Sequence, residues 1–271
     1  MHRFATLTTL VAAAILATAQ VARAAQVFTW NPAAAGLAGS AFTADRFNLG
    51  DHAEIVTSNG GLLFTDTGYM PLLGFSLNGQ GIDPAGFDNP DGTGWGAFIH
   101  YTAAGTQTLS PLGYPASATF TQLSYEIVGY NGLATFSFDA NGAPMVGGNM
   151  SNATTLLSGS LVSGQLAYLP VTSAGLSIIG TVLATVDQVL VGFSPDDFGW
   201  LEVNFIHGPD AYAFTSPNTI QISDGGLSNG GLVSVPEPAS LLLLSASVLA
   251  FAGLGRIKKR APSSTHEPQP E

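Results

Sequence analysis

The stretch Ala134-Thr135-Phe136-Ser137-Phe138-Asp139 alternates strictly between apolar and polar side chains. Successive side chains of a β-strand point to opposite faces of the sheet, so this period of two predicts a half-buried strand. The same alternation recurs in Leu123–Ile127 and Leu201–Phe205. We predict further strands at Gln26–Trp30, Glu54–Ser58, Leu62–Asp66, Leu73–Leu77, Gly96–Thr102, Gln165–Val171, Ala211–Thr215 and Thr219–Ser223.

Turn sequences separate these strands at short intervals. Asn-Gly and Gly-Gly pairs supply the positive φ angles that tight hairpins require. They occur at Asn59-Gly60-Gly61, Asn78-Gly79, Asn131-Gly132, Asn141-Gly142 and Asp224-Gly225-Gly226. Many short strands with such turns predict an all-β domain over residues 25–222, an antiparallel β-sandwich or jelly-roll-like fold, with a barrel as the other member of this class.

Three segments give weaker signals. Asn149–Leu161 is compatible with a loop or a short helix, and Ile178–Val191 with a strand or a helical turn, because its β-branched residues favour a strand. Residues 223–234 are rich in Gly, Ser and Asn, and we interpret them as a linker.

Composition and charge exclude several classes of protein. With 46% hydrophobic and 9% charged residues the chain is not a disordered one, and the absence of Cys excludes disulfides and thiolate metal sites. Arg46 is the only basic residue between Ala25 and Ser240, a stretch that contains 16 acidic residues. Such a charge repels phosphate backbones, so nucleic-acid binding is excluded.

Both ends of the chain resemble targeting segments. Residues 1–24 have the pattern of a secretory signal peptide: Arg3 precedes an apolar run over Leu7–Ala17, and Ala22 and Ala24 supply the small-x-small cleavage pattern. Near the other end, residues 239–255 are apolar and uncharged, and as a helix they span about 25 Å, the short end of what crosses a bilayer. The alternative for this segment is a buried core helix.

The charges around the second apolar segment predict its orientation. Four cations follow it directly: Arg256, Lys258, Lys259 and Arg260. Cationic flanks stay in the cytoplasm, so the preceding domain lies outside, in agreement with the signal peptide. Residues 261–271 form a polar tail that we predict to be disordered.

The triplet Pro236-Glu237-Pro238 stands immediately before this segment. Pro-Glu-Pro, an apolar helix and a basic cluster at the end of a secreted chain resemble the PEP-CTERM sorting signal of Gram-negative bacteria that make extracellular polysaccharide. The resemblance covers residues 235–260. It implies that the chain is held transiently in the inner membrane, cut at or near the triplet by an exosortase, an integral membrane Cys protease or transpeptidase, and released to the cell surface or extracellular matrix.

Two internal segments resemble a narrower group. Gly36–Phe47 and Gly68–Gly79 are similar to the flocculation-associated PEP-CTERM proteins. That resemblance implies a role in floc or biofilm formation together with extracellular polysaccharide.

The sequence contains no convincing catalytic constellation. His52, His100 and His207 are dispersed, and His100 is expected to be an ordinary strand histidine. Gly226–Gly230 matches the G-x-S-x-G nucleophile motif, but it lies in the predicted linker without the strand and helix that the motif requires. The aromatic residues Trp95, Trp200, Tyr125 and Tyr130 suit sugar stacking, although most are expected in the core.

An acidic loop offers the best candidate for a metal. Asp83, Asp88 and Asp91 lie close together and are candidate Ca²⁺ ligands, but the EF-hand spacing fails, and a solvated loop is the preferred interpretation. We therefore predict no cofactor and no enzymatic activity. The expected function is that of an exported surface or matrix protein, with a secreted carbohydrate-binding or carbohydrate-active protein as the alternative.

Overall fold

A computed structural model describes residues 27–88, 92–111, 115–171, 175–189, 200–207, 211–223 and 228–233. Apart from short 3-10 turns such as η1 (Pro32–Ala35) and η2 (Asn59–Gly61), the regular structure in these residues is β. None of the helical turns described is long and apolar enough to cross a membrane. The strands are β1 Phe28–Trp30, β2 Phe42–Ala44, β3 Arg46–Leu49, β4 His52–Ser58, β5 Leu63–Leu77, β6 Gln80–Ile82, β7 Trp95–Leu109, β8 Pro115–Phe138, β9 Pro144–Val171, β10 Gly175–Thr185, β11 Gln188–Val189, β12 Trp200–His207, β13 Tyr212–Ser216, β14 Thr219–Ser223 and β15 Ser228–Val233.

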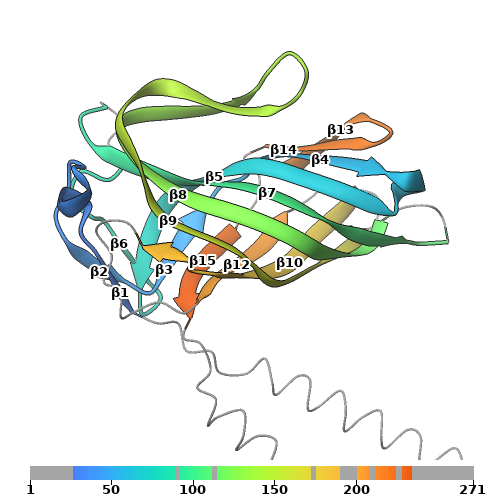
Figure 1. Ribbon diagram of the computed structural model, residues 1–271, viewed down its shortest axis with the longest axis horizontal. Helices are drawn as coiled ribbons and strands as arrows, with labels where there is room; N and C mark the ends of the chain where they lie inside the picture. The colour runs from blue at the N-terminus through green and yellow to red at the C-terminus, as the bar shows by residue number, and fades with distance from the viewer. Residues whose placement is uncertain are drawn as a thin grey trace, which may run out of the picture. The chain divides into compact units, whose positions relative to one another are not determined.

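The main sheet closes on itself. Neighbouring strands follow the order β5-β3-β15-β12-β10-β9-β8-β7, and β7 pairs with β5 again (Figure 1). The pairings around this eight-stranded ring are antiparallel. The antiparallel all-β class is therefore confirmed. A sandwich is not confirmed, because these strands belong to one closed barrel rather than to two facing sheets.

Strand β5 is the branch point of the sheet. One of its edges pairs with β7, whereas the other pairs with β4 along Leu63–Tyr69 and with β3 along Leu72–Ser76. Strands β14 and β13 continue outward from β4. At the β4 half of β5 the sheet therefore leaves the ring and forms a separate three-stranded flap, which is one wall of the cleft described below.

Several predicted strands are parts of longer ones. Leu62–Asp66 and Leu73–Leu77 fall in or beside β5, Leu123–Ile127 falls on β8, and Ala134–Asp139 covers the last five residues of β8 and the residue after it. The turn predicted at Asn131-Gly132 is wrong. Gly132 has a φ of 99° but lies inside β8, just after a register shift against β9, so its positive φ serves an irregularity within the strand and not a hairpin. Asn149–Leu161, left open by the sequence, is strand.

The linker interpretation is wrong for residues 228–233, which form β15 between β12 and β3. Leu232 is 1% exposed, and Ser228 is also buried. A side chain at Gly230 would collide with the Phe47 ring. A glycine is therefore needed at this position of β15, because the strand passes close to that ring.

A cluster of aromatic rings joins the two-stranded β1–β2 sheet to the barrel. The Trp95 ring lies 5.1 Å from Trp30 and 4.9 Å from Phe87, and Phe42 lies 4.8 Å from Phe75. Trp95 is fully buried, and its Nε1 donates a hydrogen bond of 3.1 Å to the carbonyl oxygen of Ala85. Trp95 thus fixes both the β1–β2 sheet and the loop that precedes β7.

The hairpin of β8 and β9 continues past the barrel as an arm, residues 131–151, drawn in yellow-green in Figure 1. The arm packs on the outer face of the sheet, where Phe136 lies 5.8 Å from Phe98 and 5.9 Å from His52. Near its tip, Gln221 Nε2 donates to the Gly142 carbonyl oxygen at 2.9 Å. The apolar face of Ala134–Asp139 is therefore half-buried, and it packs against the outside of the barrel.

Candidate functional site

Four ionisable side chains meet inside the barrel and form what we call the interior polar cluster: Asp51, Asp66, Tyr101 and His207. Their exposed fractions range from 1% to 6%. They come from the β3–β4 connection, β5, β7 and the end of β12, elements far apart in sequence. Asp66 and Tyr101 share the inward face with Phe64 and Ile99, because alternate strand residues point to the same side.

Hydrogen bonds connect the cluster. His207 Nε2 lies 3.3 Å from Asp51 Oδ2. The Tyr101 hydroxyl lies 3.2 Å from Asp66 Oδ1 and 3.5 Å from Asp51 Oδ1, so its one proton bridges the two carboxyl groups. His207 Nδ1 is buried and has no hydrogen-bond partner among the described residues. Asp51 is thus the central acceptor of the cluster.

Burial controls the protonation of Asp66. It raises the pKa of the Asp66 carboxyl well above its usual value, repulsion from Asp51 raises it further, and the Tyr101 hydrogen bond opposes both. Burial and the two carboxyl groups also raise the pKa of Tyr101. Both shifts favour the neutral forms of these groups, because burial disfavours charge.

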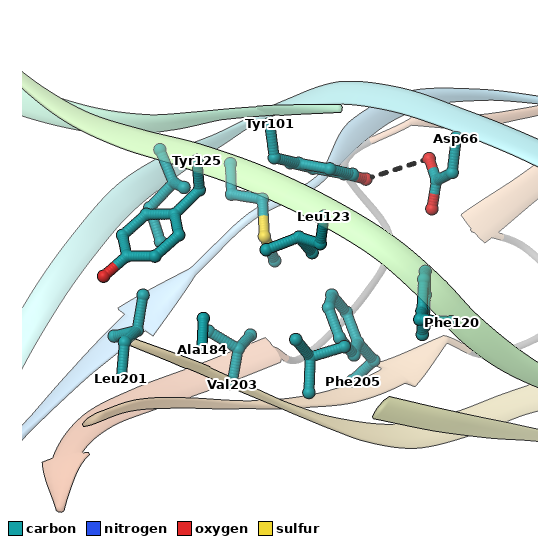
Figure 2. A pocket seen from close by; sticks show the side chains of 12 residues that line it. Asp66, Tyr101, Phe120, Leu123, Tyr125, Ala184, Leu201, Val203 and Phe205 are labelled. Carbon is teal, nitrogen blue, oxygen red and sulfur yellow. Dashed lines mark hydrogen bonds between the residues drawn. The ribbon is translucent and has the colours of Figure 1, made fainter. Parts of the chain in front are cut away.

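A small cavity adjoins this cluster. Figure 2 shows the hydrogen bond between Asp66 and Tyr101 at one side, with Leu201, Val203 and Phe205 of β12 across the cavity. The space available to the centres of water-sized molecules is about 30 Å³, enough for one or two waters. No substrate fits there. The side chains of the interior polar cluster are therefore buried beside a space that is too small for a ligand larger than water.

A second and much larger space lies at one end of the barrel, and we call it the end cleft. It measures about 560 Å³, within the range of small-molecule sites. The η2 turn, the end of β7, the start of β8 and the β13–β14 hairpin surround it. Its described lining residues are Thr57, Gly60, Gly61, Gln107, Leu109, Pro115, Phe214, Thr215, Ser216, Pro217, Asn218 and Ile220. None of these described residues is ionisable, so this part of the cleft lining carries no charge.

Backbone hydrogen bonds hold the walls of the end cleft. Thr57 donates to the Asn218 carbonyl oxygen through its N–H at 2.8 Å and its hydroxyl at 3.3 Å, which ties the β13–β14 turn to β4. Gln107 Nε2 donates to the Gly61 carbonyl oxygen, which anchors the η2 turn to β7. Because the amide nitrogen must face that carbonyl, the orientation of the Gln107 amide is determined.

The structure brings together residues that the sequence left apart. His207, interpreted as a dispersed histidine, pairs with Asp51 across 156 positions of sequence. His100 lies on a strand, β7, as predicted: its Nδ1 lies 3.3 Å from Glu126 Oε1 and its ring stacks on Tyr69 at 4.8 Å. Ser228 of the G-x-S-x-G match lies buried on β15, not on an exposed elbow.

The aromatic side chains proposed for sugar stacking are mostly core, as expected. Trp95, Tyr125 and Tyr130 are buried, and the Tyr125 hydroxyl donates to the Thr185 carbonyl oxygen at 2.8 Å. Phe214, which no sequence signal singled out, is instead 58% exposed in the end cleft. Only the position of β13 in the flap reveals its surface location.

The acidic loop is described in part. Asp83 and Asp88 lie between β6 and β7, and burial raises the pKa of Asp88. Within the described part of the chain, no group of three or more His, Asp or Glu side chains is arranged to hold a metal ion.

Other predicted site residues fall outside the described residues. They are Asp91, the signal peptide 1–24 with Ala22 and Ala24, the triplet Pro236, Glu237 and Pro238, the apolar segment 239–255, the cations Arg256, Lys258, Lys259 and Arg260, and the tail 261–271.

The raised pKa of Asp66 predicts a pH-dependent stability. Above the unfolded value of 3.8, the unfolded chain releases this proton while the folded protein retains it, so stability falls as pH rises until the folded pKa is reached. The slope contributed by one proton is about 1.4 kcal/mol per pH unit. In urea unfolding between pH 4 and pH 8, Asp66→Asn is expected to gain stability relative to the wild type as pH rises. The exposed control Asp83→Asn should show the same pH dependence of unfolding free energy as the wild type. If the difference in unfolding free energy between Asp66→Asn and the wild type did not change with pH, the raised pKa of Asp66 would be wrong.

Comparison with known proteins identifies no relative: no protein family matches the chain, and neither a curated protein nor a solved structure matches it. Its function must therefore be inferred from its own residues.

Proposed function

We propose that this chain is an exported, non-enzymatic cell-surface or extracellular-matrix protein that associates with extracellular polysaccharide in flocs or biofilms. An exosortase sorts it through Pro236, Glu237 and Pro238. One structural observation carries the non-enzymatic part. In the described residues, the ligand-sized space and the clustered ionisable groups lie in different places.

Glycoside chemistry illustrates why this separation matters. Hydrolysis of a sugar chain needs two carboxyl groups beside the scissile bond, one as the acid and one as the base or nucleophile. The Asp66 carboxyl group lines a cavity of about 30 Å³ and Asp51 is buried beside Tyr101, whereas the end cleft of about 560 Å³ has no carboxyl group in its described lining. This arrangement supports binding without turnover.

The position of β15 supports the proposed processing. The strand ends at Val233, three residues before Pro236, and it pairs with both β12 and β3. A cut at or near Pro236–Pro238 leaves this strand attached to the released domain. The closed sheet therefore remains complete after the anchor segment is removed.

The alternative is a secreted carbohydrate-binding or carbohydrate-active protein with the same sorting signal. The end cleft favours the binding form of this alternative, because its described lining contains hydroxyl, amide and apolar groups but no acid or base. Incubating the purified chain with exopolysaccharide separates the binding form from the enzymatic form of this alternative, because new reducing ends would indicate turnover. Repeating the incubation with EDTA shows whether binding or turnover depends on a divalent cation.

Sorting is tested by expressing the full chain in a Gram-negative host with and without an exosortase, and by mapping the C-terminus by mass spectrometry. With the enzyme, we expect a released protein that ends at or near Pro236–Pro238 and lacks Arg256–Arg260. Without it, these cations remain on a membrane-associated chain. Glu237→Ala should block release, whereas Glu267→Ala, in the tail, should not. A released protein that retains Arg256–Arg260 contradicts the proposal.

A further inference from the structure

We propose that the end cleft binds a neutral polysaccharide chain, with Phe214 as the surface on which a sugar ring stacks. This inference rests on the proposed function and specifies its site and the class of glycan. It follows from the charge, the mixed lining and the geometry of the cleft.

Charge selects a glycan without ionic groups. The described cleft lining contains no cation, and Arg46 is the only basic residue between Ala25 and Ser240. A uronate or sulfated polymer would lose hydration in the cleft without gaining an ion pair, and it would approach a strongly acidic protein. A neutral sugar meets neither penalty.

The lining matches the two kinds of surface that a sugar ring presents. A pyranose has apolar C–H faces and hydroxyl groups around its rim. Leu109, Pro115 and the 58% exposed Phe214 supply apolar contact surface. Four other lining residues supply hydroxyl and amide groups, which both donate and accept hydrogen bonds: Thr57, Thr215, Ser216 and Asn218. A purely apolar ligand would take the Thr215 hydroxyl and the Asn218 side-chain amide away from water without offering them a hydrogen bond.

The local backbone explains why Phe214 is exposed. Phe214 pairs with Ile220, which pairs with Ile55, so all three share one face of the flap. Ile220 and Ile55 are buried at 5% and 2% exposure, but Phe214 lies on the last strand, beyond the cover of the barrel. A register shift between Phe214 and Ser216 follows directly after Phe214 along the strand.

An exposed aromatic ring suits a sugar, because the partial negative charge on the face of the ring attracts the polarised C–H groups of a pyranose.

Gln107 keeps the opposite wall in place. Its side chain is 6% exposed, its Nε2 donates to Gly61, and Gly61 has a φ of 85°, a conformation that favours glycine. The Gln107 carbonyl oxygen accepts no hydrogen bond from the described residues. This oxygen is buried, so Gln107 acts on the cleft through the hydrogen bond that its Nε2 makes to Gly61. We therefore regard Gln107 as a positioning residue of the end cleft.

The test measures binding of the full-length chain to three neutral polymers, dextran, amylose and galactomannan, and to the anionic polymer alginate. We expect at least one neutral polymer to bind and alginate not to bind. Phe214→Ala should weaken neutral binding about tenfold, because aromatic stacking and apolar area are both lost. Phe214→Trp should bind at least as tightly as the wild type. Leu73→Ala, at a 53% exposed position outside the cleft lining, is the matched control and should not change binding.

The outcomes separate this inference from the proposed function. If a neutral polymer binds equally to the wild type and to Phe214→Ala, the site is wrong while polysaccharide association stands. If no neutral polymer binds but exosortase still removes Arg256–Arg260, the glycan assignment fails and the sorting proposal stands. Preference for alginate, or binding of the uncharged apolar dye Nile red alone, overturns the assignment of a neutral glycan.

Discussion

Replacing Asp51 by alanine is expected to lower the free energy of unfolding by about 3 kcal/mol, the lower end of the range for breaking a buried pair. The change removes the acceptor at 3.3 Å from His207 Nε2 and one of the two carboxyl groups that face the Tyr101 hydroxyl. A buried donor left without an acceptor costs about 1–3 kcal/mol.

Urea unfolding at neutral pH measures the effect. Asp51→Asn, which keeps an acceptor oxygen at the same position, should lose less stability than Asp51→Ala. The exposed Asp83→Ala is the control and should stay within about 0.5 kcal/mol of the wild type. Equal stabilities for Asp51→Ala and Asp83→Ala would show that the interior polar cluster does not contribute to the fold.

Replacing Trp95 by alanine is expected to lower the free energy of unfolding by about 3–5 kcal/mol, the usual cost of removing a large aromatic side chain from a core. Trp95 is fully buried and contacts the rings of Trp30 and Phe87 at 5.1 and 4.9 Å. The hydrogen bond from its Nε1 to the Ala85 carbonyl oxygen is lost as well. The β1–β2 sheet and the β6–β7 loop should therefore loosen before the barrel unfolds.

Hydrogen exchange followed by mass spectrometry locates this second effect. We expect faster exchange in β1, β2 and residues 83–88 of Trp95→Ala, with little change in β10 and β12. Trp95→Phe retains a ring but not the donor, so it should lie between the wild type and Trp95→Ala. Leu73→Ala, on an exposed side chain, should leave both exchange and stability unchanged. Uniform acceleration across the barrel would argue against an aromatic cluster that acts locally.

Together, these two changes probe how a chain without Cys is stabilised. No disulfide is available, so the domain depends on packed aromatic rings and on the satisfaction of its buried polar groups. The interior polar cluster and the aromatic cluster lie at different places in the sheet. Their effects should therefore be nearly additive in the double variant.

The sequence identified strands well where alternation is regular. Thr219–Ser223 matches β14 in full, and Leu201–Phe205 lies within β12. Strand prediction from the sequence was weakest where glycines lie within strands. Asn131-Gly132 has the composition of a turn, yet β8 continues through it, and the Gly-rich segment 228–233 is a central strand. In both places a neighbouring strand of the same chain approaches the glycine closely. The sequence alone does not show which strands become neighbours.

Local sequence was sufficient for the antiparallel all-β class and for the charge pattern, because alternation, turn residues and ionisable groups are properties of neighbouring or individual residues. The tertiary structure alone decided that the sheet closes, that His207 meets Asp51, and that Phe214 lies in the end cleft. Each of these depends on which strands become neighbours. Strand pairing depends on the summed packing of residues far apart in the chain, so no local pattern determines it.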